Sequence, residues 1–176
     1  MKRRKTPPLN IQIDKLTNSI ENTVSGDCFQ TEVILVSKED IRAISKKEGW
    51  LFDWKQELKQ AEREVYKLTI AGNPKVIQGL ICIETKQDHI FMHLVESAPF
   101  NKGKNKLYTG VPGNLVAFAC RLSLLRGHEG NIAFISKTKL INHYIFTLGA
   151  IHIGAGVMII DSVAALKLIH KYYKNQ

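Results

Sequence analysis

The chain has 176 residues, of which 44% are hydrophobic and 23% are charged, and it carries a formal net charge of +9. This length suits one compact domain, and the composition is ordinary for a soluble globular protein. The apolar runs are too short to cross a bilayer, and the basic start MKRRK leads into Thr-Pro-Pro rather than an apolar segment. The sequence therefore predicts a cytoplasmic protein without a membrane span or a secretory signal.

The positive charge gathers at the N-terminus, where four of the first five residues are basic. A smaller cluster is formed by Lys102, Lys104 and Lys106. A basic surface attracts nucleic acid or anionic small molecules. Because the other positive charges are scattered, we interpret residues 1–26 as a basic arm that precedes a folded domain at 27–176. A nucleic-acid-binding surface stays open as an alternative.

The cysteines and histidines indicate neither a disulfide framework nor a metal site. The chain has an odd number of cysteines without a CxxC spacing, namely Cys28, Cys82 and Cys120. We expect Cys82 and Cys120 in the core. His89 and His93 share a strand face but lie too far apart for a compact site, and a third ligand is not evident. The sequence predicts a protein without a bound metal.

Hydrophobic periodicity predicts the elements in chain order. A weak helical pattern in the arm predicts a short helix, through Ile13, Leu16, Ile20 and Val24. Residues 29–37 resemble a strand, and apolar residues at helical spacing predict two helices over about 41–50 and 51–61.

Three strand patterns follow at 64–71, 75–85 and 89–99, separated by turn residues, and predict an antiparallel meander. The third is apolar on both faces, which predicts a central strand. Its faces are expected to carry Ile90, Met92 and Leu94 on one side and Phe91 and Val95 on the other.

Residues 107–127 form a glycine-bearing turn that runs into an amphipathic helix. Gly110 and Gly113 bracket the turn, and we expect the helix to begin near Gly113. The free amides and the dipole at such a start can hold a phosphate, although a simple tight turn gives the same spacing. A strand at 131–137 then follows as a crossover, parallel to the strand at 89–99. The chain ends with a helix at 138–149, a hairpin around 154–156 and a helix at 162–173.

The order of these elements and two short motifs resemble the GNAT superfamily of acyl-CoA-dependent N-acetyltransferases over residues 29–161. The family's pyrophosphate loop reads Arg/Gln-x-x-Gly-x-Gly/Ala, followed by an apolar position. The corresponding positions here are Leu107, Gly110, Pro112 and Leu115. The family's aromatic-Tyr helix, which leads to a Leu-Gly step, resembles His143-Tyr144 and Leu148-Gly149. Leu107 and Pro112 depart from the loop pattern, and nearby lysines would partly replace the missing Arg or Gln.

The resemblance implies an α/β fold with a GNAT-like mixed central sheet flanked by helices and a C-terminal helix. It implies acetyl-CoA as a co-substrate, with its pantetheine arm in a wedge between the strands at 89–97 and 131–137. An amide near Val95 would polarise the thioester carbonyl, and Lys137 would contact a phosphate. The residues implied to cradle the pyrophosphate are Gly110, Val111, Pro112, Gly113, Asn114 and Leu115.

Two residues are candidates for proton transfer when an amine attacks the thioester. Tyr144 matches the family position that often acts as the acid, although a core aromatic would also suit this helical face. Glu96, at the end of the central strand, is the candidate base, although a solvated glutamate is the simpler interpretation. His93 competes for this role, but a histidine among apolar neighbours is more often a satisfied core residue.

The predicted function is direct transfer of an acetyl group from acetyl-CoA to an amine, whose identity the sequence leaves open. A non-catalytic acyl-CoA-binding module and a basic nucleic-acid-binding protein are the alternatives. The oligomeric state is likewise left open.

Overall fold

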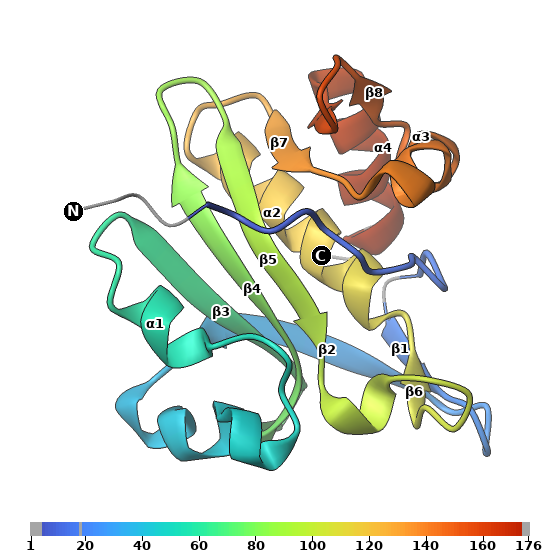
Figure 1. Ribbon diagram of the computed structural model, residues 1–176. Coiled ribbons are helices and arrows are strands. Elements are labelled where there is room, and N and C mark those ends of the chain that lie inside the picture. The colour runs from blue at the N-terminus through green and yellow to red at the C-terminus, as the bar shows by residue number, and fades with distance from the viewer. Residues whose placement is uncertain (1–4, 18, 174–176) are drawn as a thin grey trace.

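The computed structural model describes residues 5–17 and 19–173. Within them, nine strands form one mixed sheet in the order β6-β1-β2-β3-β4-β5-β7-β9-β8 (Figure 1). The strands are β1 (Ser19–Asn22), β2 (Cys28–Leu35), β3 (Arg63–Ile70), β4 (Asn73–Thr85), β5 (Ile90–Ser97), β6 (Tyr108–Thr109), β7 (Ile132–Ile135), β8 (Ile151–His152) and β9 (Val157–Ile160). The helices are α1 (Trp54–Leu58), α2 (Val111–Leu125), α3 (Ile141–Leu148) and α4 (Ser162–Tyr172), with 3-10 helices η1 (Lys38–Ile44), η2 (Lys46–Glu48), η3 (Pro99–Asn101) and η4 (Thr138–Leu140). The predicted α/β sheet with a C-terminal helix is confirmed.

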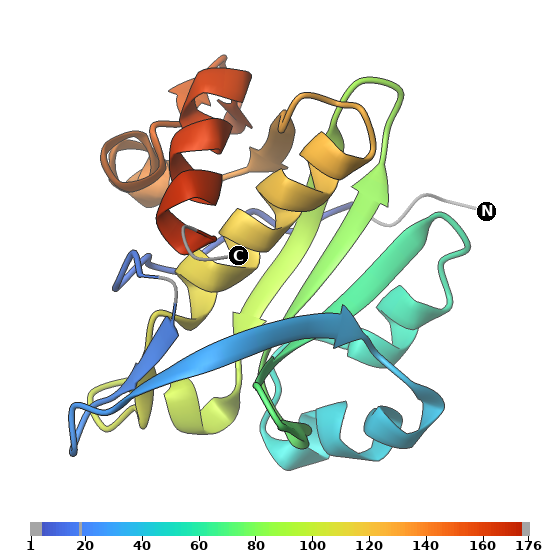
Figure 2. The same ribbon diagram turned by 180° about the vertical axis from the view of Figure 1, so that it is seen from behind.

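Helices cover both faces of the sheet and create two apolar cores. α2 and α4 lie on one face, and α1 with η1 and η2 lies on the other (Figures 1 and 2). The core on the α2 side includes Leu68, Ile81 and Leu115, whereas the core on the α1 side includes Trp54 and Leu80. The central strands β3, β4 and β5 are therefore buried on both faces, which explains their near-continuous apolar sequences.

The predicted strand pairings are confirmed. β3, β4 and β5 form the predicted antiparallel meander, and β5 then pairs in parallel with β7. β2, whose pairing was not predicted, lies antiparallel beside β3. The parallel register joins Ile90 to Ile132 and Phe91 to Ala133, near the start of both strands. Beyond these pairs the two strands diverge (Figure 1). This divergence creates the opening in which the candidate site lies.

A β-bulge changes the faces of β5, so the predicted faces are wrong beyond Met92. Cys82 of β4 pairs with Leu94, but the next residue, Ile83, pairs with Met92, which leaves His93 as the extra residue. Met92 consequently packs in the core on the α2 side, whereas Leu94 packs on the α1 side.

The helix α2 begins at Val111, two residues before the predicted start. Gly110 caps it with a φ of +95°, a left-handed conformation that glycine adopts without strain. Pro112 lies in the first turn, where its fixed φ fits a helix and its missing amide would have no intrahelical partner.

Two predicted helices are shorter than expected. The stretch at 41–50 forms the 3-10 helices η1 and η2, which end at Ser45 and at Gly49 with a φ of +97°. The second predicted helix is reduced to α1, which Asp53 caps by accepting a hydrogen bond from the Gln56 amide. These breaks leave residues 49–53 as a loop that approaches the end of β5.

The prediction of a short helix in the arm is wrong. Residues 5–17 are extended, and residues 19–22 form β1. Leu9 and Ile13 join the main core, and Ile11 packs against it, while Asn10 and Gln12 alternate with them. This two-residue period is typical of a strand. We call residues 5–17 the N-terminal segment.

Cys82 and Cys120 lie in the interior, as the sequence analysis expected. Cys28 is exposed, and all three are free thiols. In the part of the chain that the structure describes, no helix is both long and apolar enough to span a bilayer.

A buried ion pair joins η1 to the sheet. The Lys67 ammonium on β3 lies 2.7 Å from Asp40 Oδ1 and donates to the Pro74 carbonyl. The Ser37 amide and hydroxyl donate to Asp40 Oδ2. Burial would raise the pKa of Asp40, but the hydrogen bonds from Lys67 and Ser37 outweigh burial and lower it.

This shift predicts a loss of stability in acid. A carboxyl whose pKa is lower in the folded state than in the unfolded state stabilises the fold. This contribution is complete above the pKa of the unfolded state, about 3.9, and it is lost as the pH falls through the pKa of the folded state. We expect the free energy of unfolding in urea to fall between about pH 5 and pH 2. Asp40→Asn should be less stable at neutral pH and should show a flatter dependence in this window. If the stability of the variant depends on pH equally steeply, the acid sensitivity comes from other carboxyls.

Candidate active site

The N-terminal segment lies across the opening between β5 and β7 (Figure 1). The Leu9 amide donates to the Ile135 carbonyl at 2.6 Å, and the Lys137 amide donates to the Leu9 carbonyl at 3.0 Å. These bonds form a parallel bridge between Leu9 and Ser136. The segment therefore adds an extended chain to the edge of β7 that faces β5.

Tyr144 of α3 holds the middle of the segment. Its hydroxyl donates to the Ile11 carbonyl at 2.6 Å and accepts from the Ile11 amide at 3.2 Å. The neighbouring His143 Nε2 accepts from the Ile13 amide at 2.8 Å. Burial raises the pKa of Tyr144 to about 12, so the hydroxyl keeps its proton at neutral pH. Tyr144 is thus both a buried aromatic and a hydrogen-bond donor to the N-terminal segment.

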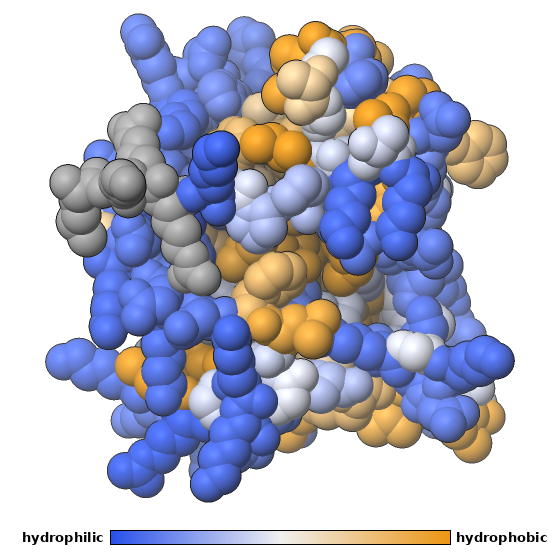
Figure 3. Space-filling model, viewed as in Figure 1, coloured by the Kyte–Doolittle hydropathy of each residue, from blue (hydrophilic) through white to orange (hydrophobic). Residues whose placement is uncertain are grey.

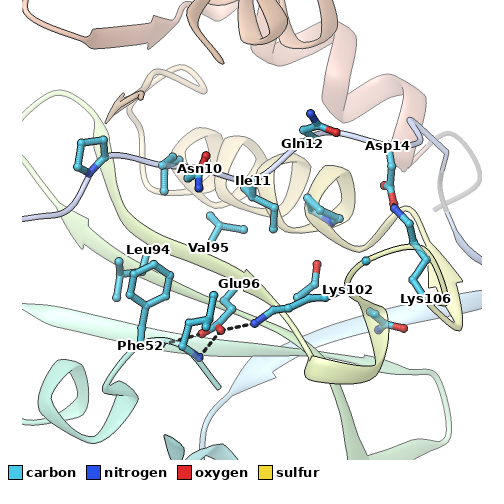
Figure 4. Close-up of a pocket in the computed structure, with 17 residues that line it drawn as sticks. Asn10, Ile11, Gln12, Asp14, Phe52, Leu94, Val95, Glu96, Lys102 and Lys106 are labelled. Carbon is cyan, nitrogen blue, oxygen red and sulfur yellow. Dashed lines mark hydrogen bonds and ion pairs between the residues drawn. The ribbon is translucent and has the colours of Figure 1, made fainter. Parts of the chain in front are cut away.

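Asp14 places a carboxylate at the glycine turn. Its Oδ1 accepts from the Gly110 amide at 3.0 Å, and its Oδ2 lies 3.0 Å from the Lys106 ammonium. The two side chains point toward one another at the edge of the cavity (Figure 4). An amide at the start of a helix beside an ammonium is a suitable setting for an anion. The anion at this turn is a group of the chain itself.

The other residues predicted at the turn have different surroundings. Val111 and Leu115 are in the core, and Pro112 lines the cavity described below. Asn114 Nδ2 donates to the carbonyls of Gly110, Thr17 and Ser19, and it thereby ties the turn to the chain that enters β1.

Gly113 has no room for a side chain. A Cβ at this position would lie 2.1 Å from the Tyr172 hydroxyl oxygen and 2.7 Å from the Lys15 carbonyl oxygen. We expect Gly113→Ala to lower the free energy of unfolding by about 1–3 kcal/mol, because α4 and Lys15 must shift. Chemical denaturation would measure this change. The cost should shrink in a Tyr172→Phe background, whereas additive costs would show that the hydroxyl contact is not its source.

Lys137 lies at the other end of the segment. Its amide binds Leu9, whereas Gly110 binds Asp14, and five residues of extended chain, about 16 Å, separate the two contacts. The structure therefore brings Lys106, and not Lys137, to the glycine turn.

Glu96 is almost fully buried at the end of β5, with 2% of its surface exposed. Its oxygens lie 2.6 Å from the Leu51 amide, 2.6 Å from the Trp54 indole nitrogen and 2.5 Å from the Lys102 ammonium. The Phe52 amide is a fourth donor at 3.4 Å. The carboxylate thus anchors the loop before α1 and is not the solvated glutamate of the simpler interpretation. The Val95 side chain, one residue earlier, packs in the core on the α2 side.

His93 is paired at both ring nitrogens. Its Nε2 lies 2.7 Å from a Glu84 oxygen, and its Nδ1 lies 2.6 Å from the Thr6 hydroxyl. Burial lowers the pKa of His93 against the opposing effect of the hydrogen bond with Glu84. This is the satisfied buried histidine that the sequence favoured.

A cavity of about 280 Å³ lies between the N-terminal segment and the end of β5. Ile11 and Asp14 line one side, and Phe52, Val95 and Glu96 line the other (Figure 4). Apolar side chains gather at the centre of this face of the molecule, surrounded by hydrophilic ones (Figure 3). Within residues 5–17 and 19–173, no group of three or more His, Cys, Asp or Glu residues is placed to hold a metal ion.

The strand order, the diverging parallel pair and the crossover helix define the GNAT fold. The dodecameric spermidine N-acetyltransferase from Vibrio cholerae aligns with 78% of this chain and 96% of its own, with a TM-score of 0.57 and 16% identity. A structure of spermidine N-acetyltransferase from Vibrio cholerae in complex with CoA and spermine aligns with 78% and 98%, with a TM-score of 0.55 and 14% identity. The ribosomal-protein-S18-alanine N-acetyltransferase from Escherichia coli aligns with 75% and 95%, with a TM-score of 0.54 and 13% identity. No protein-family model and no curated protein sequence matches the chain. The likeness to solved structures establishes the fold.

Ile11 and Asp14 were not predicted as site residues, and Lys106 was named only as one of the lysines near the glycine turn. The alternation of apolar and polar residues from Leu9 to Asp14 was the signal that could have revealed a strand in the arm. The partner edge of this strand lies more than a hundred residues away, on β7.

Proposed function

We propose that the protein is an acyl-CoA-dependent N-acetyltransferase in which an amine attacks the thioester of acetyl-CoA directly. One observation carries this proposal. Beside the diverging strands β5 and β7 lie a protonated Tyr144 hydroxyl and an anion-binding turn at Gly110. A thioester reaction in such a cleft needs a proton donor near the sulfur and a positive site for the phosphates.

The proposed roles follow from this arrangement. The turn from Gly110 to Leu115 receives the pyrophosphate, chiefly through the Gly110 amide, and Lys137 remains a proposed contact for a more distant phosphate. The amides near Val95 polarise the thioester carbonyl. Tyr144 gives its proton to the departing thiolate, so the C–S bond breaks as the C–N bond forms.

The acceptor amine is proposed to enter through the cavity beside Phe52 and Glu96. Glu96 is the proposed base because it lines that cavity at the end of β5. To take a proton from the acceptor amine, the Glu96 carboxylate would give up one of its four hydrogen bonds and bind the nitrogen of that amine instead. A structural anchor of this kind also suits a non-catalytic acyl-CoA-binding module, which is the second candidate function.

Calorimetric titration of the full chain with acetyl-CoA tests the proposal. ATP and a short DNA duplex serve as polyanion controls, and each titration is repeated at high salt, where purely electrostatic binding to DNA weakens steeply. We expect selective binding of acetyl-CoA that persists at high salt, and thiol release when an amine acceptor is supplied. Salt-sensitive DNA binding without acetyl-CoA binding would overturn the proposal. Acetyl-CoA binding without turnover across a broad amine panel would favour the non-catalytic module.

A further inference from the structure

The N-terminal segment contacts the groups that the proposed function assigns to acetyl-CoA. Ile11 accepts a hydrogen bond from the Tyr144 hydroxyl and donates one to it, and Asp14 accepts a hydrogen bond from the Gly110 amide. Leu9 takes up the edge of β7 that borders the opening. The segment and a bound acyl-CoA would therefore compete for the same atoms.

The chemistry of the segment also resembles that of the proposed ligand. The pantetheine arm of CoA is a narrow chain with amide groups that leads to a pyrophosphate. Residues 9–14 form an extended chain of peptide groups that leads to the Asp14 carboxylate, which the Gly110 amide and the Lys106 ammonium hold. Charge-assisted hydrogen bonds of this kind suit a carboxylate and a phosphate equally.

We propose that the N-terminal segment is an intramolecular ligand of the acyl-CoA cleft, which must leave before acyl-CoA binds. We further propose that Lys106, released from Asp14, then contacts a phosphate of the ligand. Both statements rest on the proposed function. The apparent dissociation constant of acyl-CoA equals its intrinsic value divided by the fraction of molecules with an open cleft.

The contacts indicate where the segment would open. The side chain of Asp14 is 19% exposed at the mouth of the cleft, so an incoming anion can displace it first. The Lys15 carbonyl accepts from the Tyr172 hydroxyl, and the Thr17 carbonyl accepts from Asn114. These bonds involve neither the Tyr144 hydroxyl nor the Gly110 amide, and they anchor residues 15–17. The segment would therefore detach from Asp14 toward its N-terminus, with the pivot at Lys15.

The test compares single variants of the full chain by calorimetry with acetyl-CoA and by hydrogen exchange. Asp14→Asn should bind acetyl-CoA about tenfold more tightly, because it weakens a charge-assisted contact that keeps the cleft closed. The same change should speed exchange of the Leu9, Ile11 and Ile13 amides without ligand. Saturating acetyl-CoA should speed hydrogen exchange of these amides in the unaltered protein.

Two further variants serve as comparisons. Lys106→Ala should weaken acetyl-CoA binding in the Asp14→Asn background, where its role in closing the cleft is already removed. Glu21→Gln removes a negative charge that pairs with Lys15, and Glu21 does not line the cavity. This variant should leave the affinity unchanged, which excludes a general effect of net charge.

The outcomes separate the two proposals. If acetyl-CoA binds the unaltered protein as tightly as Asp14→Asn, and exchange of the segment does not change, the ligand binds without displacing the segment. The inference would then be wrong while the proposed function stands. If Asp14→Asn speeds exchange and yet neither protein binds acetyl-CoA, the opened cleft is not an acyl-CoA site, and both proposals fail.

Discussion

Tyr144→Phe is expected to lower kcat for acyl transfer by about 10²-fold or more, because general acid catalysis typically contributes about that much. The variant also leaves the partly buried Ile11 carbonyl without its 2.6 Å donor, which should reduce the free energy of unfolding by about 1–3 kcal/mol. Loss of the contact loosens the N-terminal segment, so binding of acetyl-CoA should not weaken. Steady-state thiol release, calorimetry and denaturation would measure the three effects.

Tyr172→Phe is the matched control. Tyr172 is also a buried tyrosine whose hydroxyl donates to a carbonyl of the N-terminal segment, at Lys15 and 3.0 Å. It lies on α4, outside the cleft, so its replacement should cost similar stability and preserve kcat. If both variants lower kcat equally, Tyr144 acts through packing and not as an acid.

Glu96→Gln is expected to lower kcat by about 10²-fold or more if the carboxylate is the base. Glu96→Leu should instead destabilise the fold, by about 3–5 kcal/mol, because the buried Trp54 indole and the Leu51 amide lose their acceptor. Glutamine keeps one acceptor oxygen, so its cost in stability should be smaller. Turnover and urea denaturation of both variants separate the chemical role from the anchoring role.

The control for this pair is Glu84→Gln. Glu84 is a buried carboxylate on the neighbouring strand, paired with Lys86 and His93, and it does not line the cavity. Its replacement should cost stability and leave kcat unchanged. If Glu96→Gln keeps full turnover with a native-like fold, Glu96 is an anchor alone.

Local pattern predicted most of the fold. Strands β3, β4 and β5 carry apolar residues bounded by turn residues, and α2 carries an apolar face after a glycine, so each could be recognised within its own stretch of chain. The parallel pairing of β5 with β7 follows from the crossover helix between them. The strand-like arm was misread because four apolar residues at loose helical spacing masked the alternation that precedes them.

The surroundings of the candidate residues could not be predicted in this way, because their partners are distant in sequence. Three of the four donors to Glu96 lie more than forty residues earlier, on the loop before α1 and at the start of α1. Tyr144 meets Ile11 from a helix 133 residues away. A spacing pattern describes one element at a time. It placed Glu96 and Tyr144 on their elements but gave no information on which groups they would meet.

The extra residue at His93 reverses the alternation of side chains in the rest of β5. Because Met92 and Val95 both face α2 while Leu94 faces α1, every side chain after the bulge is delivered to the face opposite to the one that simple alternation would give. Glu96 reaches the loop before α1 only through this offset. Insertion of one residue between Leu94 and Val95 would exchange the two faces beyond it, removing Glu96 from Trp54 and turning Val95 away from the α2 side, whereas deletion of His93 would only remove the bulge and keep both faces. Changes in length should therefore be tolerated in the hairpin before β5 and at the bulge, but not between Leu94 and Glu96.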